Sequence, residues 1–485
     1  QKLLTAAVNF WNMVVNGRTF ATGGNAENEH FGDAGKTSDQ FYFNPDETCN
    51  IYNMCKLSAY LFEITGEAKY ADYMERALLN GLAGSIDSDG RKTYYQWLGT
   101  DSHKLFHSDT GAFWCCTGTG METFSKLTQM LAFTSDDGLK INIYQSASYN
   151  LDGAAFTLVN DDETNTLTFT RGGELKLSLR VPYWAKSYSL KLNGEALSAK
   201  EENGYLKLDR TFSEGDVLEY VTEFSVYTES TPDDEDVFAF KYGPYLLAAV
   251  GPRYEKKNYV KGYFNGGWMS ELDTKLEATE NGFILHTDDF DIPMKKYCEI
   301  VNEVYTPYFH RVDSLPAEAV NEDYAMRATV TSDLGYSVYP AANMDANYWY
   351  DYSGSCVYLC AVNDGYVGVN SVGKSEFSNS LFDFYVPYVS IPAGEHWLAY
   401  DFGTERTVSG ISVYFYDNIA TITAPSNYSV QYWTGSEWKA VSNQSQPTTV
   451  RDQFNTVTFD AVTTTGLRLV INAEKAAGII EWKVL

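Results

Sequence analysis

The chain has 485 residues, and its 64 Asp and Glu outnumber its 36 Lys and Arg, which gives a formal net charge of −28. This balance argues against a nucleic acid or an anionic membrane as partner, because phosphate contacts require clustered basic side chains. The length allows about three domains of ~150 residues. No apolar run approaches the ~20 residues of a membrane-spanning helix.

No signal peptide precedes the first predicted helix, since Gln1 opens directly into helix-like sequence. We expect that the protein starts upstream of this residue. The acidic composition fits a secreted or cell-surface protein.

The seven cysteines are an odd number and are unevenly spread, so they do not predict a disulfide scaffold. Cys356 and Cys360 are close enough in sequence to form a pair, and Cys298 is expected to be a buried thiol. The other four lie in the first quarter of the chain: Cys49, Cys55, Cys115 and Cys116.

Apolar residues recur at helical spacing in the first part of the chain. The predicted helices are 1–18, 47–65, 68–83 and about 117–133. Asp46 is predicted to cap the second helix, and Gly66 to end it. The segment 93–97 is expected to be a strand or an extended loop.

The polar loop 25–45 joins the first two helices, and a loop of about 20 residues is usually functional. Its carboxylates Glu27, Glu29 and Asp33 are candidates for general acid/base chemistry, although lone acidic residues in loops are usually solvated. His30 either orients a substrate hydroxyl or is an ordinary loop histidine.

From residue 138 onward the helical period gives way to short alternating strands broken by Gly, Asn and Asp. The pattern up to about residue 312 predicts a β-sandwich, and 192–195 (Leu-Asn-Gly-Glu) is a hairpin signal. Short strands return in 397–485 and predict a second β-sandwich or jelly roll. Trp397 and Trp438 are expected to pack in its core.

Four residues at predicted helix starts have side chains that suit a metal ion: Glu47, Cys49, Cys115 and Cys116. One carboxylate and three thiolates are donors that Zn²⁺ accepts in tetrahedral geometry. A thiolate at a helix N-terminus is also stabilised by the free N–H groups and the helix dipole, which favours a nucleophile. The alternative is three unrelated buried thiols and a solvated glutamate.

Several motifs in the first 252 residues together resemble the β-L-arabinofuranosidase glycoside hydrolases that use a zinc-bound cysteine. They are TGGNAENEHFGD (22–33), DETCNIYNMCKLSAYLF (46–62), YADYMERALLNGLAGSID (70–87) and FWCCTGTGMETFSKL (113–127). The β-strand motifs LSLRVPYWA, LKLNGE, GYLKLDRTFSEGD and KYGPYLLAAV support the same resemblance.

The resemblance implies that Glu47, Cys49, Cys115 and Cys116 hold Zn²⁺ and that Cys115 is the nucleophile of a retaining double displacement. It places the general acid/base in the loop after the Thr-Gly-Gly turn, at Glu29 or, in a second alignment, at Asp33. That carboxyl is expected about 5 Å from the Cys115 sulfur.

The C-terminal part resembles a discoidin, or coagulation-factor 5/8 C-type, module through CAVNDGYVGVNS (360–371) and HWLAYDFGTERTVSGISVYFY (396–416). The segments 425–441 and 455–471 support it. Such modules commonly bind glycans and often hold a structural Ca²⁺. Asp364 is either a calcium ligand or an ordinary turn aspartate.

The predicted architecture is therefore a multidomain α+β chain. Residues 1–137 form part of an (α/α)-barrel catalytic domain, 138–312 a β-sandwich region, and 313–485 a discoidin-like jelly roll. The family's barrel needs more helices than these four ranges supply. An upstream fragment or a second chain is expected to complete it, and the activity of this chain alone depends on that.

Three functions remain open at this point. The first is a glycosidase that removes β-L-arabinofuranosyl or related rare sugar residues from plant-type glycans. The second is a non-catalytic carbohydrate-binding or adhesion protein. The third is a protein in which the metal ion is only structural, since a closed four-ligand zinc site is normally structural.

Overall fold

The computed structural model describes the chain with gaps, in two compact units. The first unit holds the described residues of Gln1–Phe106, Phe113–Val250 and Gly262–Ser314, and the second holds those of His107–Ala112 and Leu315–Leu485. The described residues are 2–41, 44–99, 102, 104, 106–107, 113–250, 263–265, 272–287, 291–301, 303, 305–312, 325, 328–334, 362, 389–417 and 422–485.

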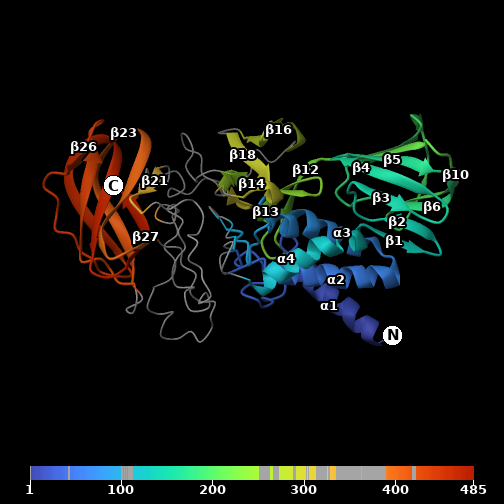
Figure 1. The fold of residues 1–485 in the computed structure, drawn as a ribbon, viewed down its shortest axis with the longest axis horizontal. Coiled ribbons are helices and arrows are strands. Elements are labelled where there is room, and N and C mark those ends of the chain that lie inside the picture. Colours follow the sequence, from blue (N-terminus) through green and yellow to red (C-terminus); the bar gives the residue numbers. More distant parts are fainter. Residues whose placement is uncertain are drawn as a thin grey trace. The chain divides into compact units, whose positions relative to one another are not determined.

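The first unit opens with helices packed side by side, drawn in blue and cyan in Figure 1. They are α1 Lys2–Arg18, α2 Thr48–Thr65, α3 Ala68–Arg76, which continues as the π-helix Ala77–Leu82, α4 Cys115–Lys126 and α5 Thr128–Leu131. The first three ranges agree with the predicted helices, because each was read from a local apolar period. The fourth, predicted over about 117–133, instead begins at Cys115 and is divided into α4 and α5, and residues 132 and 133 belong to a strand. Trp11, Tyr52 and Met74 lie at their common core and are at most 3% exposed.

The second helix shows one confirmed and one wrong prediction about its ends. Gly66 ends α2 in the left-handed conformation, with φ of 67°, and its N–H donates to the Phe62 carbonyl. Asp46 does not cap the helix: Glu47 holds the N-cap position and makes no side-chain cap bond. The Asp46 carboxylate instead turns inward and accepts a hydrogen bond from the Thr22 hydroxyl.

α1 carries a second apolar face beside its buried one. Leu3 is 87% exposed, Phe10 38% and Met13 49%, at helical spacing along one side. Exposed Tyr60 and Ile64 add to the apolar surface on α2. The described helices therefore form an open layer with exposed apolar side chains rather than a closed barrel. Across the described residues, no helix is long and apolar enough to cross a membrane.

A β-sandwich follows the helices and is drawn in teal and green in Figure 1. One sheet has the order β1-β2-β6-β10-β9, and the other has the order β3-β4-β5-β11-β7-β8. The strands are β1 Ala132–Ser135, β2 Gly138–Ile141, β3 Ala147–Asn150, β4 Ala155–Asp161, β5 Thr164–Arg171, β6 Gly173–Arg180, β7 Ser187–Leu192, β8 Glu195–Ala196, β9 Lys200–Glu202, β10 Tyr205–Phe212 and β11 Val217–Glu223.

The predicted hairpin between β7 and β8 is confirmed. Leu192 pairs with Glu195, and Asn193 and Gly194 both have positive φ, 55° and 83°. Only residues that tolerate the left-handed region fit this two-residue turn, which is why Asn-Gly signals it.

A third sheet occupies the rest of the first unit, so the region expected as one sandwich contains two sheet assemblies. Its order is β15-β20-β13-β14-β18-β17-β16, with β12 paired to β13 and β19 to β14. Its strands are β12 Val226–Ser230, β13 Val237–Tyr242, β14 Tyr245–Val250, β15 Tyr263–Asn265, β16 Leu276–Thr279, β17 Gly282–His286, β18 Asp291–Lys296, β19 Tyr305–Thr306 and β20 Tyr308–Val312. Two short 3₁₀ helices, Leu272–Thr274 and Tyr297–Glu299, lie between these strands.

A buried ion network ties α3 to the sandwich. Arg180 of β6 has a fully buried side chain and donates hydrogen bonds to Asp72, to Glu75 and to the Asn142 carbonyl. The second oxygen of Glu75 accepts the indole N–H of Trp184. Such a network is costly to break because each partner left behind is a buried, unpaired charge.

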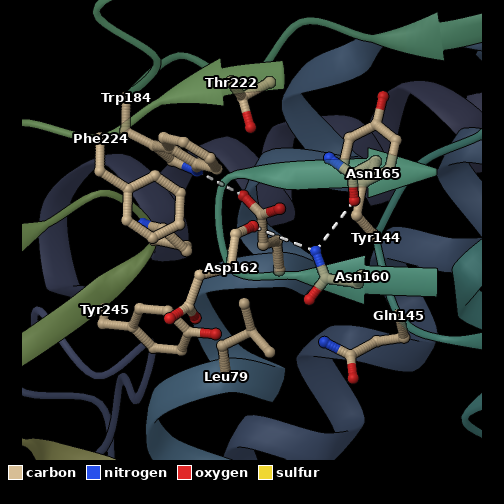
Figure 2. Close-up of a pocket in the computed structure, with 12 residues that line it drawn as sticks. Leu79, Tyr144, Gln145, Asn160, Asp162, Asn165, Trp184, Thr222, Phe224 and Tyr245 are labelled. Carbon is tan, nitrogen blue, oxygen red and sulfur yellow. Dashed lines mark hydrogen bonds between the residues drawn. The ribbon is translucent and has the colours of Figure 1, made fainter. Parts of the chain in front are cut away.

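A small cavity lies where α3, the sandwich and the third sheet meet (Figure 2). Trp184, Phe224 and Tyr245 line one side, and Asn160 and Asn165 line another. Its volume of about 20 Å³ holds about one water molecule. It is too small for a sugar ring and shares no residue with the Glu and Cys cluster.

The second unit is built of strands, drawn in orange and red in Figure 1, and its sheet has the order β22-β27-β23-β26-β24-β25, with β21 paired to β23. The strands are β21 Thr329–Ser332, β22 Val389–Ile391, β23 Gly394–Tyr416, β24 Asn427–Trp433, β25 Trp438–Ala440, β26 Phe454–Ala473 and β27 Ala477–Val484. Cys356, Cys360 and Asp364 lie outside the described residues.

The prediction that Trp397 and Trp438 pack in the core of this unit is wrong. Both side chains are half-buried, and each ring centroid lies 4.2 Å from the Arg468 guanidinium carbon. Neighbouring core positions such as Leu398 and Leu467 are fully buried. Because strand side chains alternate between the two faces, the tryptophans take the outer face with Arg468 between them.

Candidate metal and catalytic site

The four residues at the two helix starts meet in space. Glu47 and Cys49 begin α2, and Cys115 and Cys116 form the first turn of α4. One ligand atom from each lies within 4.8 Å of the others. No further group of three or more such residues is found among the described residues.

Asp46, directly before Glu47, holds the start of α2 against the Thr-Gly-Gly turn. Its side chain is fully buried, and the Thr22 hydroxyl donates to it at 2.9 Å. A Cβ at Gly24 would lie 1.6 Å from its Oδ1, so only glycine lets the Thr-Gly-Gly turn pass over this carboxylate. Burial raises the pKa of Asp46 to about 7. Asp46 thereby fixes Glu47 relative to the loop that follows Gly24.

The start of α4 is fixed by close packing. Trp114 holds the N-cap position in extended conformation and is buried, so α4 begins at Cys115 itself. A Cβ at Gly120 would lie 2.7 Å from the side chain of Lys92, so this glycine lets the lysine stem cross the helix. Cys115 and Cys116 are thus held in the first turn, where the N–H groups of the helix are free.

The cluster is tightly connected by contacts between its members. The Cys116 sulfur lies 3.2 Å from the Cys49 sulfur and 3.7 Å from Glu47 Oε1. Cys116 is buried, whereas Cys115 is exposed. Of the adjacent pair, Cys115 is therefore the one open to a substrate, and Cys116 faces the inside of the cluster.

The electrostatics of the cluster favour a cation. Hydrogen bonding with Cys116 and Cys49 holds the pKa of the Cys115 thiol well below its ordinary value. Burial raises the pKa of Cys116, and it raises the pKa of Glu47 to about 7. Without a counter-charge these groups cannot all ionise together. A divalent metal ion would supply that charge.

The donor set fits a metal ion of the Zn²⁺ type. Three sulfurs and one carboxylate oxygen match its preferred ligands, and Zn–S bonds of ~2.3 Å place sulfurs about 3.8 Å apart in a tetrahedron. The observed Cys49–Cys116 separation of 3.2 Å and the 4.8 Å limit of the cluster bracket that spacing. The donor types and their spacing therefore fit a metal ion of this kind.

Glu29 lies next to this cluster, on the loop that follows Gly24. Asn28 and Glu29 both have positive φ, 48° and 63°, a conformation that non-glycine residues adopt only where the surroundings enforce it. The Glu29 carboxylate accepts a hydrogen bond from the Tyr94 hydroxyl, and that hydroxyl lies 3.5 Å from the Cys115 sulfur. One hydroxyl thus connects a carboxylate with the exposed thiol.

Asp33 and His30 are not brought to the cluster. The Asp33 side chain is 84% exposed and lies 4.0 Å from the Lys36 ammonium. His30 is exposed, and its Nδ1 lies 2.6 Å from the Asn28 carbonyl oxygen. The structure therefore places Glu29, and not Asp33, beside Cys115.

Two residues of the site were not predicted from the sequence. Tyr94 lies in a segment expected only as extended chain, and its contacts with Glu29 and Cys115 join residues far apart in sequence. Thr119 lies one turn after Cys115, and its hydroxyl is 2.9 Å from the Cys49 sulfur. The helical spacing from Cys115 was the only available signal for Thr119.

Comparison with known families matches three parts of the chain. Residues 1–129 match the family described as "Beta-L-arabinofuranosidase, GH127 catalytic domain", and residues 134–223 match its middle domain. Residues 389–469 match a "NedA-like, galactose-binding domain".

Individual relatives agree with these matches. A non-reducing end β-L-arabinofuranosidase of Bifidobacterium longum subsp. longum is 25% identical over 259 residues, which are 47% of this chain and 38% of that protein. The crystal structure of a GH127 β-L-arabinofuranosidase from Geobacillus stearothermophilus T6 has the same fold, with a TM-score of 0.52 at 18% identity, over 64% of this chain and 57% of that one. The chain thus spans little more than a third of its curated relative.

Proposed function

Since the chain carries the catalytic and middle domains of the GH127 β-L-arabinofuranosidases, we propose that it is the catalytic part of a retaining glycosidase that uses Cys115 as nucleophile. The substrate is a glycan, of the plant type, that ends in β-L-arabinofuranose or a related rare sugar. The observation that carries the proposal is the exposed Cys115 thiol, with three further metal ligands behind it and the Tyr94–Glu29 pair in front.

Each side chain has a defined part in this mechanism. The Cys115 thiolate attacks the anomeric carbon, while the Glu29 carboxyl gives its proton to the departing glycosidic oxygen. The product is a glycosyl thioether on Cys115. Glu29 then takes a proton from water as the water attacks the same carbon, and the carbon–sulfur bond breaks to return the thiolate. Two displacements at one carbon retain its configuration.

Glu47, Cys49, Cys115 and Cys116 would hold Zn²⁺, which when bound keeps the thiols deprotonated and makes the Cys115 sulfur a better leaving group. Tyr94 would hold Glu29 in place and within reach of Cys115. The contact of one hydroxyl with both the Glu29 carboxylate and the Cys115 sulfur supports the spacing of about 5 Å that a retaining pair needs.

Two features bear on the setting of this enzyme. The C-terminal match to a galactose-binding domain supports attachment to a glycan, and the net charge of −28 fits a secreted or cell-surface protein. The exposed apolar face of α1 supports completion of the helical barrel by an upstream fragment or a second chain. Activity of the present chain would depend on that completion.

The decisive experiment compares wild type with Cys115→Ser. We expect one zinc ion per wild-type chain by emission spectroscopy. With the barrel complete, we expect wild type to hydrolyse p-nitrophenyl β-L-arabinofuranoside and the variant to lose this activity. Hydrolysis at equal rates by both proteins would refute the nucleophile. The control is Cys55→Ser, which removes a buried thiol outside the cluster and should retain both metal and activity.

A second candidate is a non-catalytic carbohydrate-binding protein with a structural zinc site. The completeness of the donor set favours it, because a metal ion with four protein ligands is normally structural. This reading predicts glycan binding that is unchanged in Cys115→Ser, together with no hydrolysis by wild type when the barrel is complete. Cleavage by wild type would rule it out.

A further inference from the structure

Thr119 connects the two halves of the candidate metal site. It lies on α4, one helical turn after Cys115, and its hydroxyl donates to the Cys115 carbonyl oxygen at 2.8 Å. The same hydroxyl oxygen lies 2.9 Å from the sulfur of Cys49 on α2. No other hydroxyl among the described residues has a recorded hydrogen bond to the Cys49 sulfur.

The protons on these atoms define what happens when a metal binds. Thr119 has one hydroxyl proton, and its bond to the Cys115 carbonyl uses that proton. While that bond is made, Thr119 has no proton left to donate to the Cys49 sulfur. A metal-bound cysteine is a thiolate without a proton. The contact then survives only if Thr119 turns its O–H toward the sulfur.

We propose that Thr119 is a positioning residue of the metal site, whose hydroxyl donates a hydrogen bond to the Cys49 thiolate in the metal-loaded protein. This inference rests on the proposed function only in taking the Glu and Cys cluster to bind a metal ion. The bond fixes the direction of the Cys49 sulfur and withdraws charge from it, as outer partners of metal ligands do. Thr119 touches no reacting atom.

The chain contains a matched control one turn further along α4. The Thr123 hydroxyl donates to the Thr119 carbonyl at 2.8 Å, which is the same helical back-bond that Thr119 makes to Cys115. Thr123 is buried and has no recorded hydrogen bond to a cysteine. A threonine that serves only the helix should therefore behave like Thr123.

The test compares Thr119→Val, Thr119→Ser and Thr123→Val for binding of Zn²⁺, measured by competition with a chromophoric chelator. Thr119→Val keeps the shape but removes the hydroxyl, and we expect its zinc affinity to fall about 10- to 100-fold. Thr119→Ser keeps the hydroxyl and should bind as wild type does. Thr123→Val should also bind as wild type does. With Co²⁺, the thiolate charge-transfer band should shift in Thr119→Val and return in Thr119→Ser.

Three results would overturn the inference. The first is a Thr119→Val protein with wild-type affinity and an unshifted band. The second is an equal loss in Thr119→Val and Thr123→Val, which would assign the effect to helix packing. The third is a Thr119→Ser protein as weak as Thr119→Val. Wild type that takes up neither Zn²⁺ nor Co²⁺ would instead refute the metal site itself, and Thr119 with it.

Discussion

Replacement of Glu29 by Gln should remove most of the activity, whereas replacement of Asp33 by Asn should leave it unchanged. The two carboxylates lie four residues apart on one loop, and the sequence admits either as the general acid/base. Only Glu29 reaches the cluster, through the Tyr94 hydroxyl that lies 3.5 Å from the Cys115 sulfur. The Asp33 side chain is 84% exposed, with Lys36 as its neighbour.

The magnitude follows from the role. A positioned general acid/base contributes about 10²- to 10⁴-fold, which is about 3 to 5 kcal/mol of transition-state stabilisation. Glu29→Gln keeps the size of the side chain and its bond to Tyr94, but it can neither give nor take the proton. Asp33→Asn removes one exposed charge, and exposed pairs contribute at most about 1 kcal/mol.

The assay measures kcat/KM for an alkyl and a p-nitrophenyl β-L-arabinofuranoside, with wild type active in the same preparation. Glu29→Gln should lose more activity on the alkyl glycoside, because p-nitrophenolate departs without a proton. Azide, which needs no deprotonation, should accelerate release of the sugar from the Cys115 thioether in the variant. Equal losses in Glu29→Gln and Asp33→Asn would refute the assignment, as would a Glu29→Gln protein that retains full activity on both substrates.

Three further predictions concern the supporting residues. Tyr94→Phe should lower kcat/KM by about 10- to 100-fold, which is the contribution of a hydrogen bond to a charged group. The zinc content, measured by emission spectroscopy, should not change. A lowered zinc content would contradict the placement of Tyr94 outside the donor set. Arg180→Met should lower the free energy of unfolding by about 3–5 kcal/mol in a urea titration, because it leaves Glu75 buried with only the indole N–H of Trp184 as a partner. The control Lys191→Met breaks an exposed ion pair and should lower it by at most about 1 kcal/mol. Similar losses in both variants would disprove the argument. Burial lowers the pKa of Lys241 from its ordinary 10.5 to about 7, so between these pH values the unfolded chain binds more protons than the folded one. The free energy of unfolding therefore falls as the pH drops from 10.5 to 7, by up to about 1.4 kcal/mol per pH unit. Lys241→Met should flatten this slope, and an unchanged slope would show that Lys241 does not titrate as described.

The helices of the first unit could be predicted from the sequence because each is defined by the local spacing of its apolar residues. Apolar residues at intervals of three and four predicted α1, α2 and α3 together with its π-helical continuation within about two residues. The left-handed Gly66 and the Asn193-Gly194 turn could be predicted for the same reason, since both depend on the conformation of single residues.

Asp46 shows where local reasoning fails. An aspartate before a helix is a common cap, and its sequence neighbours give no sign of the Thr22 hydroxyl. The carboxylate turns to Thr22 because the fold brings the Thr-Gly-Gly turn over it, at a distance that leaves no room for a Cβ at Gly24. Trp397 and Trp438 were misplaced for a related reason, because the Arg468 that lies between them comes from a strand distant in sequence.

The sequence alone determined the chemistry that this protein can carry. Glu47 with Cys49, and Cys115 with Cys116, are local pairs at helix starts, and their side chains are donors that a metal ion could use. The tertiary structure alone decided which groups work together. It set Cys115 outward and Cys116 inward, brought Glu29 rather than Asp33 to the thiol, and added Tyr94 and Thr119 as partners. These choices depend on contacts between segments far apart in the chain, which no local pattern encodes.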